Sequence, residues 1–361
     1  MRFSPKDSSD LTRRGLLGLT LAAPFLAGCG IQPGRSFSTQ GADGRQVALL
    51  LPLTGAAAAV GQNMARAAVL AVGGDGGPPV IDTGDTAEGA AAAAKVALDG
   101  GAKLLMGPLR ADQTPAVLAV AGRVPVVTFS NDDTLAAQGA FVMGITPAQS
   151  VATMFSYARA QGVSRIAVVA ADTPLGAATA MAARGIGAAG GIEITTVLLR
   201  DPGAGGLVAA LKNAGGMPQA VFLPDGGRAL ASFAKGLAGS GVQLLGSVQW
   251  GVADPAADAN LSGAWFAAPP PDLFLPFADR FAAAHGEAPG VVAGLGHDAA
   301  LMAMGLAGAG AVSRKGLIRK GGFTGVLGPF RFLDDGRCQR DLAVLTLSGG
   351  ELSVLAEVSG T

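Results

Sequence analysis

Residues 47–72 read VALLLPLTGAAAAVGQNMARAAVLAV, and the class of fold can be inferred from this segment. Val47–Leu51 is a short, continuous apolar run, which is typical of a strand buried on both faces. Gln62–Val72 then has the spacing of a helix with one apolar face. That face is formed by Met64, Ala67, Ala68 and Ala71. A buried strand followed directly by an amphipathic helix indicates the repeating unit of a parallel sheet.

The same alternation of strands and helices continues along the rest of the chain. Short apolar runs at Val80–Asp82, Leu104–Met106 and Val126–Phe129 alternate with Ala-rich helical stretches, and a second series follows between Pro147 and Val248. Such strands predict parallel sheets covered by helices on both faces, and right-handed crossovers make each sheet doubly wound. We therefore predict an α/β protein of two similar parallel-sheet lobes.

The C-terminal part of the chain adds two helices and a β-rich tail. We expect helices at Leu273–His285 and Val291–Gly308. The tail is too short to form a core of its own, so we expect no third domain. Its predicted strands are Phe330–Phe332, Leu342–Leu347 and Leu352–Leu355.

The N-terminus has the pattern of an export signal. Basic residues precede Gly15–Leu26 (GLLGLTLAAPFL), an apolar run too short to span the hydrocarbon of a bilayer as a helix. The run ends in Leu26-Ala27-Gly28-Cys29, which resembles the bacterial lipobox, in which the cysteine thiol receives the lipid. We predict a signal peptide over residues 1–28 and a lipid anchor on Cys29. The segment Thr12–Leu17 also resembles a twin-arginine signal, although Sec export stays open.

The residues that follow the predicted anchor indicate a tether. Residues 29–45 are polar, aperiodic and rich in Gly, Pro and Ser after the cysteine, as in a flexible linker. The chain has two cysteines, and acylation of Cys29 leaves Cys338 without a partner. We therefore expect neither a disulfide framework nor a cysteine metal site. Because no Asp follows Cys29, we expect the anchor in the outer rather than the inner membrane of the envelope.

Composition excludes several classes of function. The 26 basic and 26 acidic side chains cancel, so nothing predicts a nucleic-acid surface. The mean hydropathy of +0.43 comes from Ala, Gly, Leu and Val spread along the chain rather than from a membrane span. We therefore expect membrane contact through the N-terminal lipid alone.

Catalytic motifs are missing, and we predict no enzyme and no cofactor. The sequence has no nucleophile elbow, phosphate loop, zinc-protease motif or dinucleotide fingerprint. His285 is predicted in a solvated turn, and His297, within an Ala/Leu helix, is more typical of a structural residue. Asp82, Asp85 and Glu88 form a carboxylate cluster, but the sequence does not establish the separation that a glycosidase pair needs.

Four segments together resemble the type I periplasmic-binding-protein family of the leucine-binding class. The first is Val47–Gly55 followed by Gly61-Gln62, and the second combines Gly107-Pro108-Leu109 with Val124–Ser130 (VPVVTFS). The third is His297-Asp298-Ala299, where the family usually has Tyr-Asp-Ala. The fourth is Phe323–Phe330 (FTGVLGPF) with Asp335-Gly336. The resemblance covers about residues 46 to 356.

This resemblance implies two lobes joined by a multi-strand hinge, with a ligand cleft at the carboxyl ends of the strands. The implied division is lobe 1 at 46–146, lobe 2 at 147–268, helices returning to lobe 1 at 269–312, and a hinge and lobe 2 closing segment at 313–361. The loops that face the cleft would supply Thr54, Leu109, Arg110, Ser130, Asn131, Asp132, Asp172, Leu175, Asp225, Gln249 and Trp250.

The predicted cleft departs from the amino-acid receptors of that family. The loop after the third strand has few hydroxyl groups, and Leu175 stands where a Tyr commonly precedes the Gly. The acidic partner of a ligand's ammonium group would fall near Gln249 or Trp250, neither of which is charged. Arg110 offers a bidentate clamp for an anion, or pairs with Asp112 or Asp132 on the surface.

These departures are similar to those of the penicillin-binding protein activators, a branch of the same family. Those are outer-membrane lipoproteins that contact a peptidoglycan synthase, and the better-studied ones add an N-terminal helical-repeat domain, which has no counterpart before residue 46. Two hypotheses follow: an anchored regulator whose partner is a peptidoglycan synthase, and a solute receptor that delivers a small polar ligand to an ABC permease.

Overall fold

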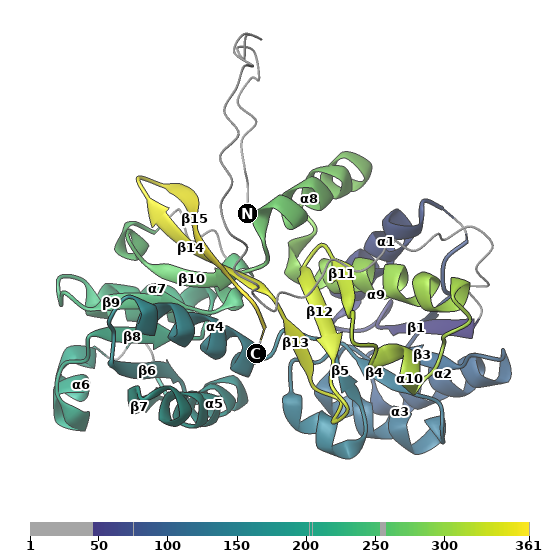
Figure 1. Cartoon of the computed structure of the whole chain (residues 1–361), viewed down its shortest axis with the longest axis horizontal. Coiled ribbons are helices and arrows are strands. Elements are labelled where there is room, and N and C mark those ends of the chain that lie inside the picture. The colour runs from purple at the N-terminus through teal and green to yellow at the C-terminus, as the bar shows by residue number, and fades with distance from the viewer. Residues whose placement is uncertain (1–45, 75, 202, 204, 253–257, 361) are drawn as a thin grey trace, which may run out of the picture.

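A computed structural model describes residues 46–74, 76–201, 203, 205–252 and 258–360. Within these residues the chain forms two α/β lobes that lie side by side (Figure 1). The predicted signal peptide, Cys29 and the tether lie outside the described residues.

The first lobe is built on a parallel sheet with the strand order β2-β1-β3-β4-β5. The strands are β1 (Val47–Leu51), β2 (Val80–Asp82), β3 (Leu104–Met106), β4 (Val126–Thr128) and β5 (Phe141–Val142). Its helices are α1 (Ala58–Val72), α2 (Ala87–Asp99), α3 (Thr114–Ala121) and, from much later in the chain, α9 (Gly290–Gly308). The prediction of a doubly wound lobe is confirmed.

The surroundings of β1 explain why Val47–Leu51 is apolar at every position. Leu49 and Leu51 pack into the cluster that contains Met64 of α1 and residues of α9. Ala48 and Leu50 point to the other face, against α2 and α3. Because successive side chains of a strand alternate between faces, a strand covered on both sides needs apolar residues at every position.

The second lobe has a larger, mixed sheet with the order β15-β14-β10-β9-β8-β6-β7. The strands are β6 (Arg165–Ala171), β7 (Glu193–Leu199), β8 (Ala220–Leu223), β9 (Gln243–Gly246), β10 (Trp265–Ala268), β14 (Leu342–Ser348) and β15 (Glu351–Val358). The helices are α4 (Pro147–Ala160), α5 (Pro174–Gly190), α6 (Leu207–Gly215) and α7 (Gly227–Leu237). The tail strand β14 pairs antiparallel with β10, and β15 pairs antiparallel with β14; the sequence pattern did not predict this arrangement.

One expected strand is shorter than predicted. The last apolar run of the second series, Val242–Val248, predicts a strand over its whole length, but β9 ends at Gly246 and a 3₁₀ helix, η4, covers Val248–Val252. The hydroxyl of Ser247 donates to the carbonyl of Pro224 and accepts from the backbone N–H of Gln249. These side-chain hydrogen bonds compete with sheet pairing and turn the chain. The strand therefore ends before the apolar run does.

The chain passes between the lobes after β5, after β10 and after β13. The second passage leads into α8 (Pro271–His285) and α9, and then into α10 (Arg314–Leu317) and a small antiparallel sheet. That sheet consists of β11 (Phe323–Gly325), β12 (Gly328–Phe332) and β13 (Cys338–Arg340). By length and composition α9 is the one helix in the described ranges that would suffice to cross a membrane, but 78% of its most apolar window is buried inside the protein.

A buried polar network lies where α9 meets the small antiparallel sheet. The Asp298 carboxylate accepts the backbone N–H groups of Val326 (2.7 Å) and Leu327 (3.2 Å). The guanidinium of Arg340 lies 3.8 Å from it and donates to the carbonyl of Met143, on the first passage between the lobes. His297 Nδ1 is 3.1 Å from Asp298 Oδ1, so His297 is a core residue as predicted.

Candidate functional site

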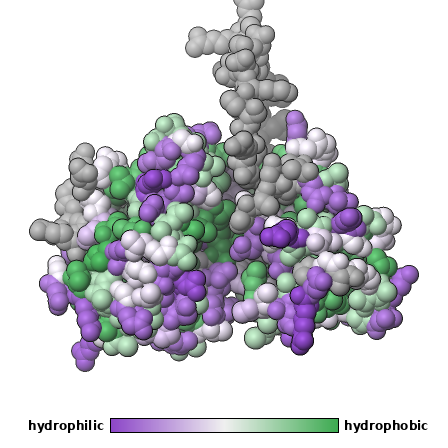
Figure 2. Space-filling view, turned by 180° about the vertical axis from the view of Figure 1, so that it is seen from behind, coloured by the Kyte–Doolittle hydropathy of each residue, from purple (hydrophilic) through white to green (hydrophobic). Residues whose placement is uncertain are grey.

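A cavity of about 560 Å³ lies between the lobes, at the carboxyl ends of β3 and β4. The loops that follow these strands form one wall, and η4 with the start of α9 forms the other. We call this cavity the cleft. It is lined by Leu109, Arg110, Ala111, Asp112, Phe129, Ser130, Asn131, Gly144, Ile145, Val248, Gln249, Val291, Val292 and Leu295. Figure 2 shows hydrophobic side chains in the hollow between the two lobes.

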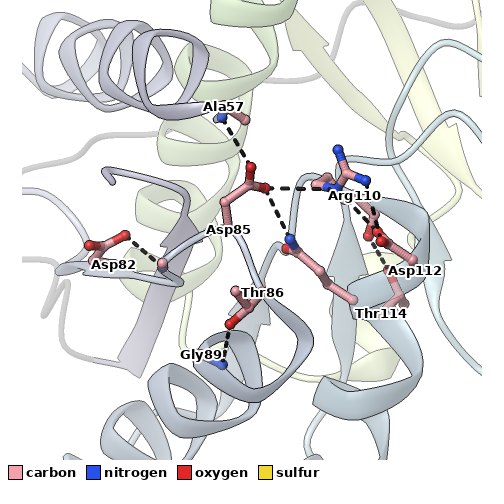
Figure 3. Close-up of polar contacts among 10 residues, drawn as sticks. Ala57, Asp82, Asp85, Thr86, Gly89, Arg110, Asp112 and Thr114 are labelled. Carbon is pink, nitrogen blue, oxygen red and sulfur yellow. Dashed lines mark hydrogen bonds and ion pairs between the residues drawn. The ribbon is translucent and has the colours of Figure 1, made fainter. Parts of the chain in front are cut away.

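Arg110 is the cation on the cleft wall, and its charge is partly satisfied by neighbours. Its Nε and Nη2 atoms donate to the Asp112 carboxylate at 3.2 and 3.3 Å. The buried carboxylate of Asp85 lies 3.7 Å from Nε (Figure 3). Asp112, the nearer partner, raises the pKa of the Arg110 guanidinium. The pairing with Asp112 that we considered is therefore present, and half of the Arg110 side chain remains exposed.

The carboxylate cluster after β2 has a structural role. Asp85 accepts the N–H of Ala57 at the start of α1 and the side-chain amide of Gln113. Asp82 accepts from the backbone of Leu53 and from the hydroxyl of Thr54, and that hydroxyl lowers the pKa of Asp82. The cluster thus fastens the loop between β1 and α1. Thr54, a predicted cleft residue, is bonded to Asp82 instead of lining the cavity.

The loop after β4 combines a cleft surface with a helix cap. Ser130 and Asn131 line the cavity. The Ser130 hydroxyl accepts the N–H of Asp132, and Asp132 accepts from Thr134 at the start of the 3₁₀ helix η3 (Asp133–Gln138). The capping turn that we considered is therefore present, and Asp132 belongs to the cap rather than to the cavity wall.

The predicted residues of the second lobe separate into two groups. Leu175 and Gln249 meet Asn131 of the first lobe around a narrow space next to the cleft. Asp172 lies 3.7 Å from Arg200 on the surface, away from the cavity wall. Asp225 is buried and accepts the N–H of Ala171; removal of water from its carboxylate raises its pKa.

Trp250, which we placed among the cleft residues although a tryptophan in such a position more often packs at a hinge, does not line the cavity. It is fully buried, stacks on Phe266 and donates its indole N–H to the carbonyl of Leu223. Gly246 provides the space, because a Cβ there would overlap the indole ring. A glycine four residues before the tryptophan was the sequence signal that we missed.

The lining of the cleft combines the Arg110–Asp112 pair with several apolar side chains. Five apolar residues line the cleft that were not predicted from the sequence: Ile145, Val248, Val291, Val292 and Leu295. The carboxylate on the wall, Asp112, is already bonded to Arg110, so a ligand ammonium group would have no free acidic partner among the lining residues. Within the described ranges, no group of three or more His, Cys, Asp or Glu side chains is placed to hold a metal ion.

The sequence matches the family described as periplasmic binding protein over residues 45–351. The comparison with curated proteins finds no match. Many solved structures share the fold, and three of them are compared with this chain. A putative branched-chain amino acid ABC transporter protein from Rhodospirillum rubrum is 21% identical with a TM-score of 0.73, covering 86% of this chain and 99% of that one.

The second is a solute-binding protein of an ABC transporter from R. palustris in complex with benzoate. It is 20% identical with a TM-score of 0.64, and the coverage is 87% of this chain and 96% of that one. The third is full-length LpoA, a penicillin-binding protein activator, from Haemophilus influenzae, 18% identical with a TM-score of 0.69. The match covers 88% of this chain and 60% of LpoA, so the chain spans less than two thirds of that protein.

Proposed function

Because the chain belongs to the periplasmic-binding-protein family, we propose that it is a non-enzymatic extracytoplasmic receptor for a small carboxylate. The ligand would bind in the cleft between the lobes and be held by their closure. An ABC permease would then be the partner that receives it.

The observation that carries this proposal is the make-up of the cleft. A half-exposed guanidinium faces a cavity of about 560 Å³ whose other walls are mostly apolar. Arginine presents two parallel N–H donors to a carboxylate, and apolar walls favour the burial of a hydrocarbon body. The benzoate bound to the R. palustris protein is a ligand of this kind.

We expect benzoate and 3-phenylpropionate to raise the melting temperature of the purified protein, and leucine to leave it unchanged. A ligand that binds only the folded state and is present at a concentration of 100 times its Kd adds about 2.7 kcal/mol to the free energy of unfolding.

Arg110→Ala should weaken carboxylate binding by about tenfold or more, because it removes a charged hydrogen-bond donor. Arg66→Ala, at an exposed arginine that pairs with Glu287 away from the cleft, is the matched control. A thermal-shift screen followed by calorimetry measures both effects.

A second candidate is the role of the activators, in which a peptidoglycan synthase binds the outer surfaces of the lobes. It is favoured by the two carboxylates that already engage Arg110, since a ligand anion must compete with them. The two functions predict different outcomes in the same screen. If none of the carboxylates changes the melting temperature and a synthase co-purifies with the chain, the receptor proposal is wrong.

We also propose that Cys29 carries a lipid that holds the protein in the outer membrane, facing the periplasm. The lipobox-like Leu26–Cys29 and the absence of Asp after the cysteine support this placement. Cys29→Ser should move the protein from the membrane fraction to the soluble periplasmic fraction, because a serine cannot receive the thioether-linked lipid. Cys338→Ser changes the other cysteine, which is buried, and should leave the protein in the membrane fraction. Membrane retention of the Cys29→Ser protein would refute the anchor.

A further inference from the structure

A second cavity lies beside the cleft, and its walls are almost entirely hydrocarbon. It measures about 130 Å³ and is formed by η4, the adjoining strands β10, β14 and β15, the start of α8 and the loop before α9. We call it the apolar annex. It is lined by Val248, Gly251, Phe266, Ala268, Pro269, Pro271, Phe274, Leu275, Ala278, Ala288, Pro289, Gly290, Val291, Leu345, Leu352, Ser353 and Val354. The Ser353 hydroxyl is the single polar side-chain group in this lining.

The annex and the cleft are neighbours. Val248 and Val291 line both cavities, one from η4 and the other from the first turn of α9. Each of these two side chains therefore has the cleft on one side and the annex on the other. A ligand group that reached past Val248 and Val291 from the cleft would enter hydrocarbon surroundings.

The size of the annex limits what it can hold. An engineered protein cavity of about 150 Å³ with similar apolar walls stays dry and binds benzene. The annex is close to that size, so it fits a phenyl ring or a branched group of about six carbons, and it is too small for a long acyl chain. Filling it with such a group removes apolar surface of both the ligand and the protein from water, which favours binding.

We propose that the apolar annex binds the hydrophobic end of the ligand whose carboxylate lies beside Arg110, which makes this chain a receptor for arylalkanoates or carboxylates of comparable length. The inference rests on the proposed function, because it takes the cleft as the carboxylate site. It adds a second subsite and a ligand length. The guanidinium selects the charged end, and the annex selects the apolar end.

The test compares carboxylates of increasing length: benzoate, 3-phenylpropionate and 5-phenylpentanoate, by isothermal titration calorimetry. We expect the affinity of the native protein to rise by about 30-fold from benzoate to the best longer acid, which corresponds to about 2 kcal/mol of added apolar burial. Acetate, which has a carboxylate and no body to bury, should bind most weakly.

Two variants block the annex from opposite walls. A Cβ at Gly251 would have one neighbour within 4 Å, Val291 Cγ2 at 3.9 Å, so the side chain of Gly251→Leu has space in which to extend. Ala278→Leu extends a side chain from α8 on the other wall. Both variants should keep the native affinity for benzoate and lose the 30-fold gain for the longer acids. Gly251→Ala and Ala282→Leu, the latter at an exposed position one turn further along α8, are the matched controls and should retain the gain.

The outcomes separate this inference from the proposed function. If benzoate binds in a manner that depends on Arg110 but neither blocking variant affects the longer acids, the annex is not a subsite and the receptor function stands. If no carboxylate binds the native protein, the receptor function fails and the inference fails with it. Loss of benzoate binding in one blocking variant alone would reflect damage to the fold, and the other variant then decides.

Discussion

Asp298→Ala is expected to lower the free energy of unfolding by about 3 to 5 kcal/mol, the range seen when one partner of a buried ion pair is removed. The substitution leaves the fully buried guanidinium of Arg340 without its nearby carboxylate. It also leaves the N–H groups of Val326 and Leu327 without acceptors in a region that water does not reach. Chemical denaturation followed by circular dichroism measures the loss.

Two controls show whether burial is the cause. Asp298→Asn keeps an acceptor oxygen and should lose less than the alanine variant. Glu287→Ala breaks the Arg66–Glu287 pair, whose side chains are about half exposed, and should change stability by less than about 1 kcal/mol. A loss below 1 kcal/mol for Asp298→Ala would mean that the network contributes specificity rather than stability.

Gly296→Ala is expected to destabilise the protein by about 3 kcal/mol, although alanine has a higher helix propensity than glycine. Gly296 lies on α9 where this helix crosses α1, and a Cβ there would overlap the backbone carbonyl of Met64. The backbone of α1 cannot rotate away as a flexible side chain can, so the helices must separate and lose packing along the contact.

Gly185→Ala is the matched control, because it makes the same change within a helix without a clash. Gly185 is exposed on α5, and a Cβ at that position would have no neighbour within 4 Å. This variant should gain about 0.5 to 1 kcal/mol from the lower entropy of the unfolded chain. Thermal unfolding of the two variants should therefore shift in opposite directions, and equal shifts would contradict the role of close helix contact at Gly296.

The alternating strands and helices could be predicted from the sequence, but the pairing of strands that are distant in the chain could not. The run at Val47–Leu51 is apolar at every position because both faces of β1 are covered, so the pattern contained the answer. Leu342–Leu347 has a comparable composition, and nothing local distinguishes its antiparallel place beside β10 from a parallel one. Short strands such as Trp265–Ala268 were missed because four apolar residues give too little periodicity.

The candidate site divides in the same way. Arg110 and Ser130 were placed at the cleft because loops at the carboxyl ends of parallel strands meet there. For Trp250 the sequence left packing and ligand contact open, because an aromatic residue after a strand does not reveal on which side of the loop it packs. Val291 and Val292 come from a helix that is distant in sequence from the other cleft residues, so no local pattern could assign them.

The position of α9 has a consequence for the time at which the first lobe is completed. The face of β1 that carries Leu49 and Leu51 is covered in part by α1 and in part by residues 290–308, which follow about two thirds of the chain's length later. During synthesis, or during passage through a channel that admits unfolded chains, that face is only partly covered until the last quarter of the polypeptide has emerged. Closing so long a loop is slow compared with local helix formation. The part of the protein that is made first is therefore among the last to mature.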